Sequence, residues 1–212
     1  MAVSQRSLRV TSEKFKNNRQ VKHKKEPLKD NPFFMPIYEC LMSADLLDVG
    51  GGIVLVSRKN QHGDVAVAFY LIDSYCLGVK NCSMTILDIE DYQNRVNEMR
   101  ENEAMVAVKS TYAGTLIYRV IQYAQSLGFD PPPAFEEMVG GMLHGISIDP
   151  WLQFIFGRAG RPCYVRGLSE SVADVIAIVG VLLETVGEGN FDVLIGDEDE
   201  DICGEDVTYE SV

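Results

Sequence analysis

Residues 53–81 of this 212-residue chain read IVLVSRKNQHGDVAVAFYLIDSYCLGVKN. Two apolar runs rich in β-branched residues, 53–56 and 65–72, flank a polar tract, 57–64, that contains Gly63. Apolar runs separated by a polar, glycine-containing tract predict two antiparallel strands joined by a longer hairpin loop. The rest of the fold is predicted outward from this hairpin.

Successive side chains of a strand point to opposite faces of the sheet. In the run 65–72, Val67 and Phe69 fall on one face, while Ala68 and Tyr70 fall on the other. Both faces are therefore apolar. This pattern predicts a central strand that is covered on both sides, or a strand with one face in an interface.

Residues 37–42 predict a short first strand upstream of the hairpin. Three glycines at 50–52 then precede the strand at 53–56. A phosphate-binding loop follows its strand and carries a GK[ST] sequence, and neither condition is met here. We therefore interpret the glycines as a flexible turn.

Downstream residues carry helix signals. Asp88, followed by Asp91 three residues later, predicts a helix start. A second helix is predicted from about residue 103 or 110 to Leu127, because Gly128 occupies a typical left-handed stop position. Asp130 predicts the cap of a short third helix whose first turn holds prolines 131–133. Its expected inner face comprises Phe135, Met138, Val139 and Met142.

Residues 154–156 and 163–165 predict a second hairpin across a turn at 157–161, and Pro162 indicates an edge strand or a strand start. A final helix is predicted after a cap at Ser169 or Ser171, with Gly187 as its stop. Its apolar stripe is so broad that we expect it to be deeply buried or packed in an oligomer. The stripe comprises Val172, Val175, Ile176, Val179, Leu182, Leu183 and Val186.

Runs of strands and runs of helices within one chain predict the α+β class, with a small antiparallel sheet of two hairpins covered by about four helices. A composition of 46% hydrophobic residues is enough for one core. The predicted organisation is a basic disordered arm at 1–30, a single domain at 31–187 and an acidic tail at 188–212.

The net charge of −12 is unevenly distributed along the chain. Residues 1–30 hold nine basic and three acidic side chains, a net charge of +6, so the remainder carries −18. Such an arm predicts contact with nucleic-acid phosphates. The alternatives are a solvated tail, an arm that folds against the acidic body, and a transit peptide. The predicted nucleic-acid-binding residues are Arg6, Arg9, Lys14, Lys16, Arg19, Lys22, Lys24, Lys25, Arg158 and Arg161.

The arginines of the body, Arg158, Arg161 and Arg166, form a local basic patch that either grips a phosphate or carboxylate or pairs with the protein's own acidic residues. Five scattered cysteines without a CxxC pair indicate a reducing compartment, and we expect a cytoplasmic protein. The sequence shows neither a membrane-spanning apolar run nor a secretory signal.

Catalytic candidates cluster after the run 65–72. Asp73, Cys76 and Lys80 are the weak candidates, since residues in the loop after a strand often carry function. A cysteine nucleophile needs a nearby base, normally histidine. His62 lies at the opposite end of the strand from Cys76, and nothing in the sequence places His144 near Cys76. Tyr75 and Cys82 lie in the same stretch.

We predict neither a metal nor a cofactor. A zinc site would need Cys76, Cys82, Cys163 and His144 to converge from separate segments, without the paired spacing that structural zinc sites show. A paired-carboxylate or Mg²⁺ site would need Asp73 to meet Asp45, Asp48 or Glu39, whereas a solvated carboxylate or a turn cap is the ordinary role of such residues.

Four motifs occur in order: YECL at 38–41, YLIDSYCLGVKN at 70–81, YAQSLGFDP at 123–131 and FIFGRAGRPCY at 154–164. Together they resemble a bacterial protein family with a VDxYCLGVK-like strand end and an FGxxGRPxY-like hairpin. The likeness covers roughly residues 36–168 and implies no activity. The arm and the acidic tail lie outside it.

The sequence as a whole predicts a non-enzymatic interaction module of a larger assembly, with the arm on nucleic acid and the body on a protein partner. One alternative is an acidic protein-binding or inhibitor protein. The other is an enzyme that uses the loop after Asp73.

Overall fold

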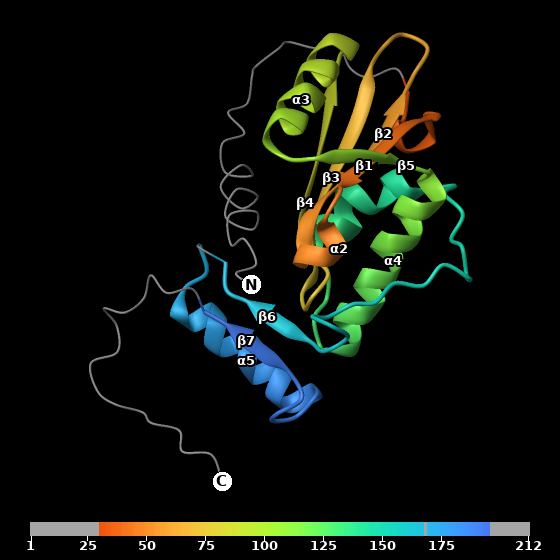
Figure 1. Ribbon diagram of the computed structural model, residues 1–212. Coiled ribbons are helices and arrows are strands. Elements are labelled where there is room, and N and C mark those ends of the chain that lie inside the picture. Colours follow the sequence, from red (N-terminus) through yellow and green to blue (C-terminus); the bar gives the residue numbers. More distant parts are fainter. Residues whose placement is uncertain (1–29, 168, 196–212) are drawn as a thin grey trace.

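The computed structural model describes residues 30–167 and 169–195. Its main element is a five-stranded antiparallel sheet in the order β4-β3-β2-β1-β5, which confirms the α+β class (Figure 1). The strands of this sheet are β1 (Ile37–Ser43), β2 (Gly51–Lys59), β3 (Val65–Asp73), β4 (Gly78–Leu87) and β5 (Met105–Val108). The helices are α2 (Leu46–Val49), α3 (Ile89–Asn102), α4 (Ser110–Ser126) and α5 (Val172–Thr185), with short turns η2 (Pro32–Phe34), η3 (Phe135–Val139) and η4 (Gly140–Leu143).

The predicted hairpin is formed by β2 and β3. Their ladder runs without interruption from Gly51 opposite Asp73 to Lys59 opposite Val65. The loop is shorter than predicted, because β2 continues through Lys59. The side chain of Asn60 shapes this loop by accepting hydrogen bonds from the backbone N–H groups of His62 and Asp64.

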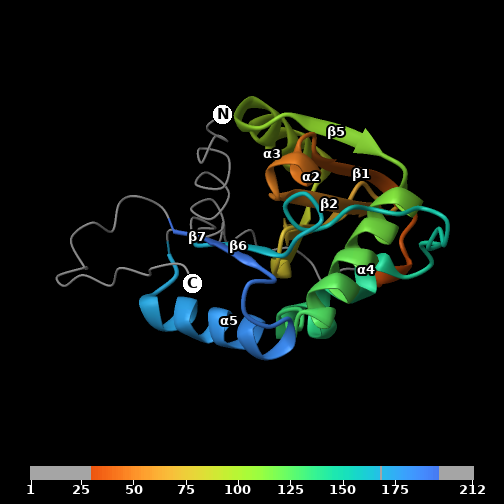
Figure 2. The same cartoon turned by 60° about the horizontal axis from the view of Figure 1, so that its bottom comes forward.

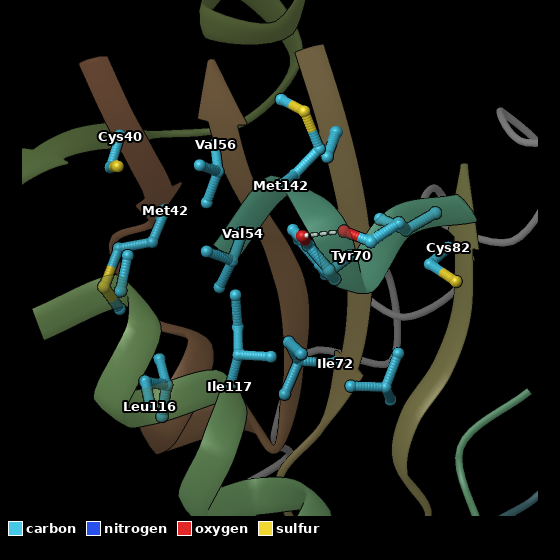
Figure 3. Close-up of a cluster of buried hydrophobic side chains, with 14 of the residues drawn as sticks. Cys40, Met42, Val54, Val56, Tyr70, Ile72, Cys82, Leu116, Ile117 and Met142 are labelled. Carbon is cyan, nitrogen blue, oxygen red and sulfur yellow. Dashed lines mark hydrogen bonds between the residues drawn. The ribbon is translucent and has the colours of Figure 1, made fainter. Parts of the chain in front are cut away.

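Both faces of β3 are covered, which confirms the prediction made from its apolar pattern. On one face, Tyr70 and Ile72 pack with Val54 of β2 against Leu116 and Ile117 of α4 (Figure 3). On the other face, the strand packs against α3. The residues of this second cluster include Leu55, Val67, Phe69, Tyr92 and Val96. The sheet is thus the middle layer of the molecule.

The predicted start of α3 and the predicted stop of α4 are confirmed. Asp88 caps α3 by accepting a 2.8 Å hydrogen bond from the N–H of Asp91. After α4, Gly128 adopts a left-handed conformation with φ of 91°. Between the two helices lies β5, which the sequence analysis missed because four residues, MVAV, carry too short a pattern. It pairs antiparallel with β1.

The glycines at 50–52 are more than a flexible turn. Gly50 ends α2 with φ of 84°, and a Cβ atom there would collide with the ring of Tyr75. Gly51 and Gly52 are the first residues of β2, and a Cβ atom on Gly52 would lie 2.7 Å from the Ser43 hydroxyl. Close packing of the strand therefore requires small residues here.

The predicted third helix begins later than expected and is irregular. Helical structure begins at Pro133, the last of the three prolines, rather than directly after Asp130, and it continues through η3 into the 3₁₀ turn η4. The turn is fixed from the sheet, since the hydroxyl of Tyr70 donates a 3.0 Å hydrogen bond to the carbonyl of Val139 (Figure 3). Val139 and Met142 are buried, as predicted for the inner face.

The predicted second hairpin is not formed. Residues 154–156 are not a strand, and β6 (Cys163–Val165) pairs in parallel with β7 (Asp192–Leu194). Only an isolated bridge joins Arg158 and Arg161 across the turn. Ordered structure therefore continues past Gly187 into the segment that was predicted to be tail.

The last helix, α5, packs beside β6 and β7 (Figure 2). Ser171, one of the two predicted caps, forms a capping box with Asp174 at the start of α5. Its inner side chains form a third apolar cluster with the loop after β3 and the end of α4. The fully or nearly fully buried members of this cluster are Cys76, Leu127, Tyr164 and Leu182.

One buried cation ties the turns to the sheet. The guanidinium of Arg58 on β2 is 5% exposed and donates to three backbone carbonyls. These carbonyls belong to Met35, at 2.6 Å, to Met142, at 3.0 Å, and to His144. Burial lowers the pKa of Arg58 from its usual value. The planar guanidinium group of arginine has several N–H donors, so it can bond to separate carbonyls at the same time.

Replacing Arg58 should reveal its structural role. Arg58→Ala leaves three carbonyls without their donors, so the free energy of unfolding is expected to fall by about 3 kcal/mol or more. Arg58→Lys should recover only part of this loss, because an ammonium group lacks the fork geometry. Urea unfolding followed by circular dichroism measures both. The matched control is Arg100→Ala, an exposed arginine on α3, which should cost less than about 0.5 kcal/mol.

Candidate functional site

The loop after β3 is organised by Asp73. Its carboxylate accepts hydrogen bonds from the backbone N–H groups of Tyr75, at 3.0 Å, and Cys76, at 2.9 Å. Burial raises the pKa of Asp73 above its usual value, although Lys80 and the backbone donors act in the opposite direction. Asp73 therefore serves as the cap of a tight turn, one of the ordinary roles expected for it.

Cys76 is fully buried beside this turn. Burial raises the pKa of its thiol well above the usual value, and the Asp73 carboxylate raises it further. A nucleophilic cysteine needs the opposite shift. The structure also does not bring His144 to it, because the His144 ring packs against Phe34 of η2, with ring centroids 4.8 Å apart.

Lys80 forms an ion pair with Glu170, with 2.5 Å between Nζ and Oε1. Glu170 also accepts hydrogen bonds from the Tyr164 hydroxyl, at 2.6 Å, and from the N–H of Gly167, at 2.7 Å. Burial alone would raise the pKa of Glu170, but the bonds from Lys80 and Tyr164 outweigh it and leave the pKa below its usual range. Glu170 is not among the residues predicted from the sequence, because no local pattern links it to Lys80.

The carboxylates considered for a metal site are separated. Glu39 accepts a 2.7 Å hydrogen bond from the Tyr92 hydroxyl on the α3 side of the sheet, away from Asp73. Within residues 30–167 and 169–195, no group of three or more His, Cys, Asp and Glu side chains is placed to hold a metal ion. None of the helices in these ranges has the length and apolar character needed to cross a membrane.

The predicted nucleic-acid-binding residues divide into two sets. Those of the arm, from Arg6 to Lys25, lie outside the described residues. Of the body arginines, Arg161 forms a 3.0 Å ion pair with Asp192 and donates to the carbonyls of Gly189 and Phe191. Arg166 donates to the carbonyl of Glu170. These two guanidinium groups therefore bind groups of their own chain.

An open cavity of about 490 Å³ lies beside the loop after β3. One wall consists of residues 152–155, Gly157 and Ala159, and the other includes Leu47 and Asp48 of α2, Tyr75, and Tyr112 of α4. Next to it, Trp151 is 88% exposed and Ile155 is 79% exposed. We refer to this cavity as the groove.

The outer side of α5 is also apolar. Ile176 is 67% exposed, and Val172 and Leu183 are exposed as well. The helix holds no charged residue between Asp174 and Glu184. Only part of the predicted stripe is therefore buried within the described chain, and we refer to the exposed residues 172, 176 and 183 as the α5 face.

No protein-family model matches this chain, and no curated protein or solved structure matches it either. The function is therefore inferred from the α5 face and from the distribution of charge along the chain.

Asp73 should be replaceable by asparagine but not by alanine. The pKa of Asp73 is raised on folding. Its contribution to the free energy of unfolding therefore falls as the pH rises from about 3.9, the value in the unfolded chain, through the folded pKa. Asp73→Asn keeps the acceptor oxygen and removes the charge, so at neutral pH its free energy of unfolding should equal or exceed that of the wild type. Asp73→Ala should lose about 1–3 kcal/mol. Equal losses in urea titrations of both variants would contradict the capping role.

Glu170 should show the opposite pH dependence. Its pKa is lowered on folding, so its contribution is present above the unfolded value of about 4.3 and is lost as the pH falls through the folded pKa. Glu170→Gln is expected to cost about 1–2 kcal/mol at neutral pH, with the difference from wild type vanishing in acid. Thermal unfolding across a pH series measures this. Glu184→Gln, at an exposed position of α5, is the control and should leave the unfolding temperature at neutral pH unchanged.

Proposed function

We propose that this protein is a non-enzymatic interaction module within a larger assembly. Its basic arm contacts nucleic-acid phosphates, and its body docks on a protein partner through an apolar helix surface. The observation that supports the docking role most directly is the α5 face, where large apolar side chains meet solvent on a helix that is apolar nearly all round.

An exposed apolar helix face is costly in water. Each large aliphatic side chain gains about 1.5–3 kcal/mol when it is buried, so Val172, Ile176 and Leu183 together offer a substantial driving force for association. Contiguous apolar patches on a surface typically mark interaction sites. The inner side of α5, which includes Leu182, already packs in the third apolar cluster, which leaves the α5 face for a partner.

The charge distribution supports the role of the arm. Residues 31–195 hold ten basic and twenty acidic side chains, a net charge of −10, so the body repels nucleic acid. The eight arm residues from Arg6 to Lys25 supply the positive charge instead. Phe15 is the only aromatic residue in the arm, so the contact is to phosphates rather than stacked bases.

An acidic protein-binding or inhibitor protein is the second candidate, and the same net charge of −10 on the body favours it. In that case a basic protein surface takes the place of nucleic acid as the partner.

Nucleic-acid binding should depend on salt and on the arm. For the full-length protein, anisotropy of labelled duplex DNA is expected to show log affinity falling linearly with log salt, with a slope of about −0.9 for each neutralised phosphate. Changing the eight arm residues to glutamine should abolish binding. Labelled RNA tested in the same way distinguishes the two nucleic acids.

The body arginines provide the comparison. Arg158→Gln with Arg161→Gln should weaken binding much less than the arm variant, because Arg161 is already paired with Asp192. If the unmodified protein binds neither nucleic acid at low salt, the nucleic-acid role is excluded, and the acidic protein-binding candidate replaces it.

The α5 face should be dispensable for folding. Ile176→Glu with Leu183→Glu is expected to keep the unfolding midpoint of the wild type while eluting earlier from a hydrophobic interaction column. Leu182→Glu, which places a charge in the third cluster, should lower the midpoint sharply. An equally large drop in the Ile176/Leu183 variant would mean that the face is buried in an obligate oligomer.

A further inference from the structure

One wall of the groove is an extended segment, residues 152–156, which crosses α4 towards α2 (Figure 2). Its side chains alternate in burial: Leu152, Phe154 and Phe156 are half-buried, while Gln153 and Ile155 are exposed. Alternation with a period of two is the pattern of a β-strand with one packed face. The segment therefore has the side-chain arrangement of a strand without belonging to a sheet.

Aromatic contacts hold this segment in place from below. Phe154 lies 5.4 Å from Tyr112 and 5.8 Å from Phe156, measured between ring centroids. Phe156 in turn stacks on Tyr123 at 5.2 Å. Because both tyrosines belong to α4, the helix fixes the path of the segment, which is thus preorganised for binding.

The backbone of the segment has no hydrogen-bond partner among the described residues. Within the described residues, none of the N–H or C=O groups of residues 152–156 makes a hydrogen bond. Among the described residues, backbone hydrogen bonds are made just beyond the segment. Gly157 donates to the carbonyl of Ser74 at 2.9 Å, and the carbonyl of Pro150 accepts from Arg119 at 3.4 Å. A row of unpaired backbone groups on an exposed strand is a template for an added strand.

The opposite wall suits an apolar strand with a basic residue. Leu47, Tyr75 and Tyr112 give the groove an apolar and aromatic lining, and its volume of about 490 Å³ has room for side chains. The exposed carboxylate of Asp48 lies on the α2 side of the groove, and the exposed Asp45 is the residue that precedes α2. Alternating apolar side chains fit such a lining, and a cation between them complements the carboxylates.

We propose that the groove binds an extended peptide by strand addition, and that the occupant is residues 7–11 of the chain's own arm, SLRVT. In this segment Leu8 and Val10 share one side of an extended strand, and Arg9 and Thr11 share the other. Val and Thr favour strands. The net charge of +6 on residues 1–30 complements the −10 of residues 31–195. This site does not depend on the nucleic-acid role of the arm.

The arm is long enough to reach the groove. The described chain begins at Asp30, whose carboxylate accepts a 3.2 Å hydrogen bond from Asn60 at the hairpin loop of β2 and β3. The groove lies near the other end of β2, about 30 Å away at the usual rise per residue. The eighteen residues 12–29 span up to about 60 Å when extended. Residues 7–11 can therefore reach the groove of their own chain.

A peptide in trans should compete with the tethered arm. The probe is a fluorescently labelled synthetic peptide of residues 1–20, titrated with two full-length proteins, the wild type and Leu8→Ser with Val10→Ser. The variant keeps every charge but weakens its own arm as an occupant. It is expected to bind the probe at least about tenfold more tightly than the wild type, because a tethered segment competes at high effective concentration.

Backbone pairing gives a second readout. Probes are N-methylated at single positions from Leu8 to Thr11. Methylation at every second position should abolish binding, and methylation at the positions between should not, since alternate N–H groups of a strand point to one neighbour. In the Leu8/Val10 variant, adding Ile155→Pro removes a backbone donor at an exposed position and should weaken probe binding. Ile176→Ser, outside the groove, is the matched control and should leave probe binding and the unfolding midpoint unchanged.

Three results would overturn the proposal. A scrambled probe of the same composition that binds equally well would reduce the contact to charge attraction. Equal affinity of the wild type and the Leu8/Val10 variant would mean that the arm does not occupy the groove. The third result concerns self-association. If Ile155→Pro abolishes it and Leu8→Ser with Val10→Ser does not, the groove binds a second copy of the chain. Loss of DNA binding in the glutamine arm variant tests the separate phosphate contact and does not bear on these outcomes.

Discussion

The constraint on which the structure depends is that neither face of β3 can meet water. Eight of its nine residues are buried, and the side chains that alternate along it are apolar on both sides. The strand must therefore be flanked by two others and covered from above and below, which α3 and α4 do. Arg58 on β2 is a buried cation within these layers, and it is tolerated because three backbone carbonyls surround it and tie η2 and η4 to the sheet.

The elements that the sequence predicts correctly are those with a local signal. The β2–β3 hairpin has its two apolar runs, α3 has Asp88 and α5 has Ser171, and each signal lies within a few residues of what it determines. The pairing of β6 with β7 has no such signal, because its partners are separated by a whole helix. The predicted hairpin at 154–165 was wrong for a related reason: its aromatic alternation is satisfied by α4 rather than by a neighbouring strand.

The site shows the same division. Asp73 and Lys80 stand out in the sequence, yet their polar groups are engaged by the turn and by Glu170, a residue that only the folded chain brings near. Unused binding capacity lies instead in the groove and on the α5 face. Neither follows from a motif, because the exposure of Ile155 or Ile176 depends on which neighbours the fold supplies.

The parallel pair of β6 and β7 also has a consequence for how the chain is made. The five-stranded sheet and α4 are complete in sequence by Ser126, but the third apolar cluster cannot close until β7 has left the ribosome and reached β6. During that interval Cys76 and Leu127 lack the cover that Tyr164 and Leu182 later provide. Domains fold as units during synthesis, and such transiently uncovered apolar surface is what chaperones recognise. The loop after β3 is thus open to wrong association until the C-terminal elements are in place.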